Sequence, residues 1–164
     1  MKSTLIIIRG NSGSGKTVLA KELQNYFGTD KCLLLQQDVL RRNILHTNDH
    51  VGNPTIDLIA DLAEFGKKHY PITILEGILR KDVYGDMLIK LCKTFSPNIL
   101  IYYLDIPFEV TLRNNNQKET PFSTTQLRNW WRERDYLPND TKFSDIGTSA
   151  MLEQIINDFE QLKK

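Results

Sequence analysis

The segment GNSGSGKT, from Gly10 to Thr17, constrains the fold of this chain more than any other feature. It follows the short apolar run from Thr4 to Arg9, which is typical of a strand buried on both faces. It leads into the segment from Lys16 to Phe27, in which Leu19 and Leu23 recur at the period of a helix. The sequence therefore predicts a buried strand, a glycine-rich turn and a helix in direct succession.

The turn has the residues that a phosphate group requires, because it fits the pattern G-x-x-x-x-G-K-[ST] at every fixed position. Its glycines allow backbone N–H groups to point inward around an anion, and the following helix adds its positive N-terminal end. Lys16 supplies a mobile positive charge for the β- and γ-phosphates, and the hydroxyl of Thr17 is a ligand for Mg²⁺. A flexible Gly/Ser turn is the alternative, but the flanking strand and helix favour a site for ATP and Mg²⁺. The predicted ATP-binding residues are Gly10, Asn11, Ser12, Gly13, Ser14, Gly15, Lys16 and Thr17.

Apolar runs and amphipathic segments continue to alternate along the rest of the chain. This alternation predicts right-handed crossovers between parallel strands, with helices on both faces of the sheet. We therefore expect a single three-layer α/β domain over residues 1–164, with a parallel sheet of about five strands. Thr55 and Ser149 are expected to cap two of the helices. The further strands are predicted at 32–37, 72–77, 98–107 and 141–147, and the further helices at 38–45, 55–69, 82–95, 108–115, 124–135 and 149–162.

Composition places the chain among ordinary single-domain proteins, with 164 residues of which 40% are hydrophobic and 25% charged. The net charge of +1 gives no indication of a nucleic-acid or membrane surface. Cys32 and Cys92 lie in apolar runs, which predicts core thiols rather than a metal site or a disulfide framework. The longest apolar run, Leu5 to Ile8, is far too short to span a bilayer, and no signal peptide is recognisable, so we expect a cytoplasmic protein.

The other motifs and the length of the chain indicate the class of enzyme. The Asn-Lys-x-Asp sequence that gives GTPases their guanine specificity is absent, and the chain is too short for a motor or a helicase. A minimal phosphotransferase remains, and such an enzyme often uses a carboxylate to take the proton of the acceptor hydroxyl. Ligands of parallel sheets bind beyond the carboxyl ends of the strands, where Asp38, Glu76 and Asp105 each follow an apolar run.

Asp38 is the preferred candidate for the catalytic base. It opens the segment DVLRR, so Arg41 and Arg42 follow it within about one helical turn. A carboxylate with arginine at this spacing suits a base beside an anion-binding group. The alternative is that Asp38 only caps a short helix, with both arginines on a solvated face.

The other two carboxylates have different expected roles. Glu76 precedes a glycine and is predicted to hold a magnesium-bound water or the acceptor hydroxyl. The alternative for Glu76 is an ion pair with Lys16 or with Arg80. Asp105 comes just before a proline and is expected to cap the next helix.

The polar and basic segment from Arg113 to Tyr136 has the composition of a mobile lid. It is predicted to form two short helices around the turn KETPF and to bring arginines onto the transferring phosphoryl group. Arg128 and Arg132 are four residues apart, which places them on one face of the second helix. A solvated charged helix, packed on Leu127 and Trp131, is one alternative. A base-stacking platform at the tripeptide NWW is another.

The phosphate loop and the segments QQDVLRR, ILEG and LDIPFEVTLR together resemble the small P-loop kinases, over roughly residues 1–137. The group that this chain is similar to contains polynucleotide 5′-kinases, zeta toxins and chloramphenicol phosphotransferase. The resemblance implies that Asp38 is the general base, that Arg41 holds the acceptor and that Arg113 contacts ATP. It also implies that the loop from Asp145 to Ser149 lines the adenine.

The predicted function is the ATP-dependent transfer of the γ-phosphoryl group to a hydroxyl of a small molecule. The alternatives are a polynucleotide 5′-hydroxyl kinase and a nucleotide-binding regulatory module without catalysis. The expected partners are therefore ATP and its acceptor, with no membrane. The predicted catalytic residues are Lys16, Asp38, Arg128 and Arg132; Arg41 and Glu76 are predicted to bind the acceptor, and Thr17 and Glu76, the latter through water, to hold Mg²⁺.

Overall fold

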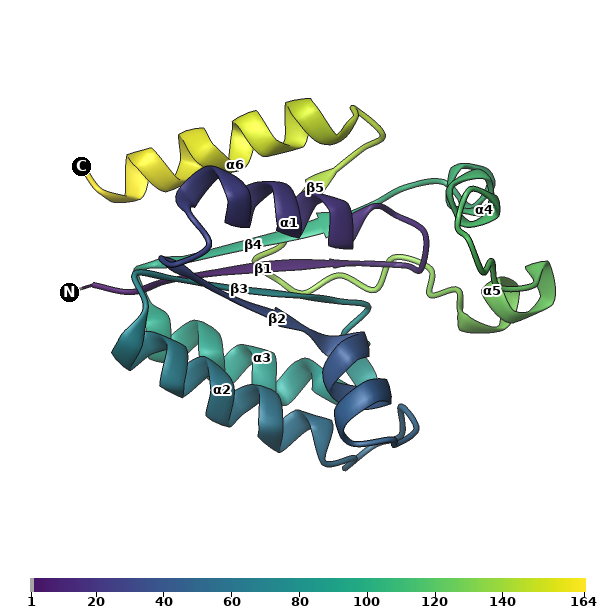
Figure 1. Cartoon of the computed structure of the whole chain (residues 1–164), viewed down its shortest axis with the longest axis horizontal. Helices are drawn as coiled ribbons and strands as arrows, with labels where there is room; N and C mark the ends of the chain where they lie inside the picture. The colour runs from purple at the N-terminus through teal and green to yellow at the C-terminus, as the bar shows by residue number, and fades with distance from the viewer. Residues whose placement is uncertain (1) are drawn as a thin grey trace.

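Five parallel strands form the centre of the molecule, in the order β2-β3-β1-β4-β5 (Figure 1). The computed structural model describes residues 2–164. The strands are β1 (Thr4–Gly10), β2 (Cys32–Gln36), β3 (Ile72–Gly77), β4 (Ile99–Leu104) and β5 (Thr141–Phe143). The predicted parallel α/β sheet is confirmed, although β5 is shorter than expected. It ends at Phe143 because its pairing partner in β4, Leu104, is the last residue of that strand.

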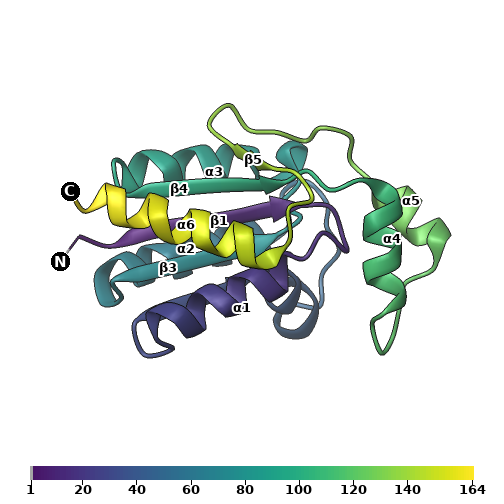
Figure 2. The same ribbon diagram turned by 90° about the horizontal axis from the view of Figure 1, so that it is seen from above.

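Helices cover both faces of the sheet, and two further helices stand apart from it. Helices α1 (Lys16–Phe27) and α6 (Thr148–Leu162) lie on one face, and α2 (Thr55–His69) and α3 (Lys81–Phe95) lie on the other (Figure 1). Helices α4 (Phe108–Asn116) and α5 (Thr124–Trp130) project beyond the carboxyl ends of the strands (Figure 2). Within residues 2–164, no helix has the length and apolar character needed to cross a membrane.

Strand β1 shows why the core has two parts. Alternate residues of a strand point to opposite faces of its sheet. Leu5 and Ile7 accordingly pack in the cluster that contains α2 and α3, and Ile6 and Ile8 pack in the cluster that contains α1 and α6. All four side chains are fully buried, so a near-continuous aliphatic run is what this central strand requires.

Two of the expected helix caps are wrong. Thr55 is the first residue of α2, and its backbone N–H donates to the side-chain oxygen of Asn53, 3.0 Å away, so Asn53 supplies the capping group. Helix α6 begins at Thr148, after Gly147, which places Ser149 inside the first turn. Gly147 has φ +86°, a conformation that glycine adopts without strain, and the chain turns into the helix there without a side-chain cap.

The segment after β2 is a π-helix, η1 (Val39–Ile44), rather than an α-helix. The N–H of Leu45 donates to the carbonyl of Leu40, five residues earlier, at 3.0 Å. π-helical turns are rare and occur frequently at functional sites. This turn lies at the carboxyl end of β2, where the sequence analysis expects the acceptor to bind.

Candidate active site

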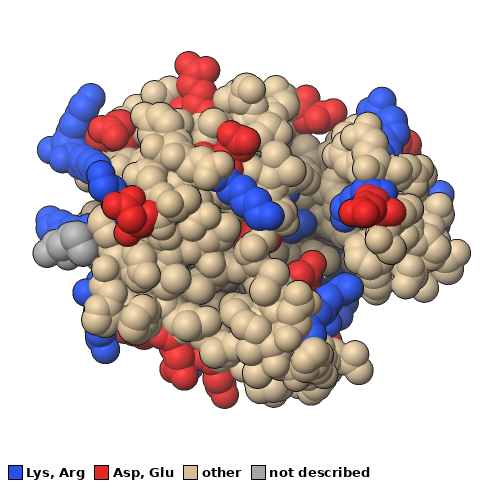
Figure 3. All heavy atoms as spheres, in the orientation of Figure 1, with Lys and Arg blue, Asp and Glu red and all other residues tan. Residues whose placement is uncertain are grey.

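Two adjoining cavities lie at the carboxyl ends of the strands. The phosphate-loop cavity has a volume of about 360 Å³, and its wall includes Gly13, Lys16, Thr17 and Glu76. The arginine-lined cavity has a volume of about 570 Å³, and its wall includes Arg41, Arg42, Arg80 and Arg132. Four residues belong to both walls: Ser12, Asp38, Ile78 and Phe122. In Figure 3 a hollow with basic and acidic atoms along its edge separates the part formed by α4 and α5 from the rest of the molecule.

The glycines of the phosphate loop adopt backbone angles, and at Gly13 a close approach, that suit a loop wrapped around an anion. Gly13 has φ +80°, and a Cβ atom there would lie 2.5 Å from the backbone oxygen of Thr111. Gly15 has φ +95° with open space where its Cβ would be. Both conformations strongly favour glycine, and the close approach at Gly13 admits no side chain. The loop therefore fits a triphosphate group by the shape of its backbone.

Lys16 is buried at the base of this cavity, and its charge is not matched by an ion pair. Its Nζ donates to the backbone oxygen of Asn11 at 2.7 Å, and 8% of the residue is exposed. Burial lowers the pKa of Lys16 to about 8, although the nearby Glu76 and Asp38 carboxylates act in the opposite direction. An anion placed beside Lys16 would stabilise its charged form and offset the cost of burying it.

Thr17 and Glu76 form the oxygen-rich side of the phosphate-loop cavity. The Thr17 hydroxyl donates to Oε1 of Glu76 at 3.0 Å, and Nε2 of Gln36 donates to the same oxygen at 3.3 Å. Neither of the ion pairs considered for Glu76 is present among residues 2–164, since Arg80 instead pairs with Asp82 at 2.7 Å. A hydroxyl and a carboxylate are oxygen donors that Mg²⁺ accepts, with phosphate oxygens and water completing its shell. The donor set thus fits a magnesium ion that arrives with a nucleotide.

Asp38 stands at the boundary of the two cavities, and its carboxylate does not cap η1. Its side chain is 56% exposed, and its Oδ1 lies 3.8 Å from Nη2 of Arg41. Arg41 is 12% exposed, donates from Nη1 to the backbone oxygen of Thr47 at 3.1 Å, and has a buried Nε without a hydrogen-bond partner in the described structure. The carboxylate and the guanidinium are therefore adjacent, as the spacing predicts, and both retain unused hydrogen-bonding capacity.

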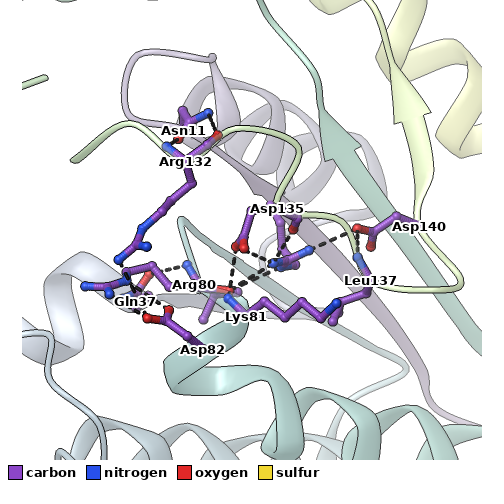
Figure 4. A network of polar contacts seen from close by, with 11 residues as sticks. Asn11, Gln37, Arg80, Lys81, Asp82, Arg132, Asp135, Leu137 and Asp140 are labelled. Atoms are coloured by element: carbon purple, nitrogen blue, oxygen red, sulfur yellow. Dashed lines mark hydrogen bonds and ion pairs between the residues drawn. The ribbon is translucent and has the colours of Figure 1, made fainter. Parts of the chain in front are cut away.

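Asn11 has a role that its position in the phosphate loop does not reveal. Its side chain is buried and contacts the backbone of Arg132 twice: Nδ2 donates to the carbonyl oxygen, and Oδ1 accepts from the N–H, each at 2.8 Å. Figure 4 shows this pair of contacts. Through them the phosphate loop is fastened to the end of the predicted lid. We call this pair of hydrogen bonds the Asn11 clamp.

The Asn11 clamp explains why one expectation about the lid is wrong. Helix α5 ends at Trp130, five residues before the predicted end, so Arg128 and Arg132 do not share a helix face. The N–H and carbonyl of Arg132 bond to Asn11 and cannot also continue a helix. Arg132 reaches the arginine-lined cavity, whereas Arg128 stacks on the ring of Phe108, with its Cζ 4.7 Å from the centroid.

The other predicted lid arginines do not line the site. Arg113 is exposed, and the described walls of the two cavities contain neither it nor Arg128. The next residue, Asn114, donates from Nδ2 to the carbonyl oxygen of Gly13 at 2.8 Å, which connects α4 to the phosphate loop. Asp105 does not cap α4; its Oδ2 accepts from the hydroxyl of Tyr136 at 2.6 Å, and this hydrogen bond raises the pKa of Tyr136 to about 12.

The chain after the lid is anchored by a buried arginine that the sequence analysis did not consider. Arg9 at the end of β1 is fully buried and pairs with Asp135 at 3.1 Å and with Asp140 at 2.9 Å (Figure 4). Its Nε and Nη2 also donate to the carbonyl oxygen of Leu79. The sequence did contain a signal for this anchor. Arg9 comes directly after a run of aliphatic residues in a strand expected to be buried, and a buried charge requires partners.

The turn after β3 is held in a strained conformation between the two cavities. Leu79 has φ +46°, which is uncommon for a residue with a side chain. Its N–H donates to the side-chain oxygen of Gln37 at 3.0 Å, and Arg9 holds its carbonyl oxygen. These contacts fix the neighbours of Leu79, so that Ile78 and Arg80 both line the arginine-lined cavity. Backbone strain of this kind is found preferentially at functional sites.

Three arginine and lysine residues of the two walls were not among the predicted site residues. Arg42 and Arg80 line the arginine-lined cavity, and Lys118 lines the phosphate-loop cavity. Lys118 is close enough to lower the pKa of Lys16 slightly by charge repulsion. Arg42 stands directly after Arg41 in the sequence, so the signal was present, but an α-helical spacing turns consecutive residues to different sides. In the structure both arginines nevertheless line one wall.

Comparison with known proteins agrees with this architecture. No protein-family model and no curated protein sequence matches the chain. A gluconokinase from Sinorhizobium meliloti superposes with a TM-score of 0.69 at 12% identity, over 98% of this chain and 94% of that chain. The APS kinase of Mycobacterium tuberculosis, solved with AMPPNP and APS, gives 0.69 at 13% identity, over 97% and 98%. The tunicamycin resistance protein of Deinococcus radiodurans gives 0.67 at 19% identity, over 95% of each chain.

The chain has the fold of the small P-loop kinases. The fold predicted from the resemblance is thereby confirmed. At these identities the likeness concerns the fold, and the chemistry of the site has to be argued from the residues themselves.

Proposed function

We propose that this protein is an ATP-dependent kinase that transfers the γ-phosphoryl group to a hydroxyl of a small molecule. The observation that carries the proposal is the position of Asp38, on the wall shared by a phosphate-loop cavity and a second cavity large enough for a small ligand. A base in that position can reach an acceptor on one side while the triphosphate lies on the other. Gluconokinase and APS kinase, which have the same fold, support the reaction class.

The reaction follows from the placement of these groups. The carboxylate of Asp38 takes the proton of the acceptor hydroxyl, and the acceptor oxygen forms a bond to the γ-phosphorus. The bond between that phosphorus and the bridging oxygen breaks, and ADP leaves with the electron pair. Asp38 afterwards releases its proton to water. The rate enhancement comes from positioning of the reactants and stabilisation of charge, rather than from covalent catalysis.

The charge of the transferring group is balanced by residues on both walls. Lys16 gives up its contact with the carbonyl of Asn11 and binds the β- and γ-phosphates, which relieves the desolvation of its ammonium group. Thr17, and Glu76 through a water, would hold Mg²⁺, which would supply Lewis-acid stabilisation of the phosphoryl oxygens. Arg132 approaches the transferring group from the body of the domain, at a position set by the Asn11 clamp.

The lid of this proposal is narrower than the segment predicted from composition. Residues 113–131 move to close over the nucleotide and acceptor, whereas residues 132–140 stay on the body of the domain. The Asn11 clamp and the Arg9 ion pairs support this division. Closure then excludes water from the γ-phosphoryl group until an acceptor is bound.

The test is ADP formation across a panel of nucleosides, sugars, antibiotics and 5′-hydroxyl oligonucleotides. We expect one class of alcohol to be phosphorylated in equal amount to the ADP released, and Lys16→Met to lower that rate by about 10²- to 10³-fold. Lys21→Met is the matched control, because Lys21 is on the exposed face of the same helix. If Mg²⁺–AMPPNP does not bind, or if Lys16→Met and Lys21→Met turn over ATP at equal rates, the proposed function is wrong.

A further inference from the structure

The arginine-lined cavity carries more positive than negative charge. Arginine contributes four of its lining residues, Arg41, Arg42, Arg80 and Arg132, against the two carboxylates Asp38 and Asp49. His46 is a further basic residue of the wall. Apolar contributions come only from Ile78, Phe122 and Trp130 among the described lining residues. Such a surface suits a polar ligand with negative charge more than a neutral one.

The existing partners of these groups show which charges are available to a ligand. Arg80 is committed to Asp82, with two contacts of 2.7 and 3.1 Å, and this pair lowers the pKa of Asp82. Asp49 accepts the hydroxyl of Tyr84 at 2.6 Å and the side-chain amide of Gln37 at 3.4 Å. Arg132 lies 3.6 Å from Asp82, outside hydrogen-bond distance. The charge of Arg80 is therefore largely balanced by Asp82, and that of Arg132 only partly so, whereas Asp49 has two neutral hydrogen-bond donors and keeps its negative charge.

Among the four arginines of this wall, Arg42 is the one with no carboxylate oxygen within 4.0 Å of its guanidinium in residues 2–164. Its Cζ lies 5.4 Å from the ring centroid of Phe122 and 5.7 Å from that of Trp130. The two rings are 4.8 Å apart and nearly perpendicular. Contacts with aromatic faces hold a guanidinium in place and leave its N–H groups free to donate. This arrangement leaves Arg42 free to donate hydrogen bonds to an anion.

Arg41 offers a second set of donors on the same wall. Its Nε is buried and has no hydrogen-bond partner, with Oδ1 of Asp49 at 4.0 Å. The two nearby carboxylate oxygens, Oδ1 of Asp38 at 3.8 Å and Oδ1 of Asp49 at 4.0 Å, are both beyond hydrogen-bond distance, so the guanidinium of Arg41 retains donors for a ligand. Arg41 and Arg42 are consecutive and both line the cavity, so one anionic group can contact both guanidinium groups.

We propose that the acceptor is an anionic alcohol, which carries a carboxylate, sulfate or phosphate besides the hydroxyl that is phosphorylated, and that Arg42 and Arg41 bind this anion. This inference rests on the proposed function and adds the chemical class of the acceptor. Asp38 then faces the hydroxyl end of the same molecule, nearer the phosphate loop. The separation of the two arginines from the base sets which hydroxyl is presented.

A binding experiment tests the anion site directly. The full-length chain, saturated with Mg²⁺–AMPPNP so that the phosphate loop is occupied, is titrated with sodium sulfate at constant ionic strength by calorimetry and by tryptophan fluorescence. We expect sulfate to bind, and Arg42→Gln to weaken it about 10- to 100-fold. Arg134→Gln is the matched control, because Arg134 has a side chain that is 78% exposed and lines neither described cavity. Absence of sulfate binding, or equal weakening by both variants, overturns the inference.

A kinetic arm separates this inference from the proposed function. Pairs of acceptors that differ only in the anion, such as a sugar with its aldonic acid, its sulfate and its phosphate ester, are compared by kcat/KM. We expect the charged members to exceed the neutral one by at least about tenfold, and Arg42→Gln to remove most of that difference mainly through KM. The carboxylate, sulfate and phosphate arms identify which anion is used. Equal kcat/KM for neutral and charged members contradicts the anionic acceptor and leaves the kinase intact, whereas lack of AMPPNP binding contradicts the kinase itself.

Discussion

The two cavities of the site are built in different ways. The phosphate-loop cavity is lined in part by one continuous stretch, the loop that ends at Thr17, whose backbone shape is set by glycine. The arginine-lined cavity is assembled from side chains of the separate segments 38–42, 46–49, 78–80 and 129–132. Binding of a triphosphate thus depends on local backbone geometry, and binding of an acceptor depends on how distant segments pack.

Because of this difference, the side chains that bind the acceptor can change while the phosphate loop stays the same. A triphosphate presents the same oxygens in every nucleotide, so a cradle of backbone N–H groups serves all of them. Acceptors differ in shape and charge, and side chains on loops can be exchanged without disturbing the sheet. Asp38 is one of the residues shared by the two walls, and the Asn11 clamp holds Arg132 of the arginine-lined cavity against the phosphate loop.

The largest expected effect comes from Asp38→Asn, which tests whether the two cavities act in one reaction. The variant keeps the size of the side chain and removes the base, so kcat should fall by about 10²- to 10⁴-fold. The affinity for Mg²⁺–AMPPNP should change little, because the phosphate loop is intact. Steady-state kinetics with calorimetry of AMPPNP binding measures both quantities. An unchanged kcat would mean that Asp38 is not the catalytic base.

An intermediate effect is expected from Asn11→Ala, which breaks the clamp between the two cavities. The amide of Arg132 loses its acceptor, Oδ1 of Asn11, and a buried hydrogen bond of this kind contributes about 1–3 kcal/mol. NMR-detected hydrogen exchange of that amide should therefore become roughly 5- to 150-fold faster. Asn11→Asp is the conservative control, because it keeps the acceptor oxygen while losing the donor to the carbonyl.

The same exchange measurement compares the proposed moving segment, 113–131, with the anchored residues that follow it, 132–140. In the unmodified, ligand-free protein, amides in residues 113–131 should exchange faster than those in 132–140, which Asn11 and Arg9 anchor. AMPPNP together with an acceptor should slow the first group. Exchange in residues 113–131 as slow as in the central strands, with no response to AMPPNP, would show that α4 and α5 are a fixed wall.

The smallest expected effect is the dependence of nucleotide binding on pH. Burial lowers the pKa of Lys16 from 10.5 to about 8, and bound phosphates favour the ammonium form, so binding takes up a proton above pH 8. The affinity for AMPPNP should therefore fall by up to about tenfold per pH unit above pH 8 and level off below it. Calorimetry between pH 7 and 9.5 measures this, and in Lys16→Met the slope should vanish. The same slope in the variant would assign the proton to another group.

Much of the fold could be predicted because its signals lie close together in the sequence. The bounds of α1, α2 and β3 agree with the periodicity of their apolar residues, and the glycine pattern placed the phosphate loop between β1 and α1. Predicted helix bounds were wrong where a contact between distant residues opposed the local preference for a helix. Helix α5 stops at Trp130, because Asn11 holds the backbone of Arg132 in another direction.

The sequence by itself determined the succession of strands and helices, the phosphate loop with Lys16 and Thr17, and the placement of Asp38 and Glu76 at strand ends. These features depend on residues that are neighbours in the chain, so spacing alone specifies them. Only the tertiary structure decided that Arg42 joins Arg41 on one wall, that Asn11 binds the backbone of Arg132 across 121 residues, and that Arg9 binds Asp135 across 126. Such contacts join groups whose proximity is set by the packing of the sheet and its helices, and no local pattern of side chains encodes that distance.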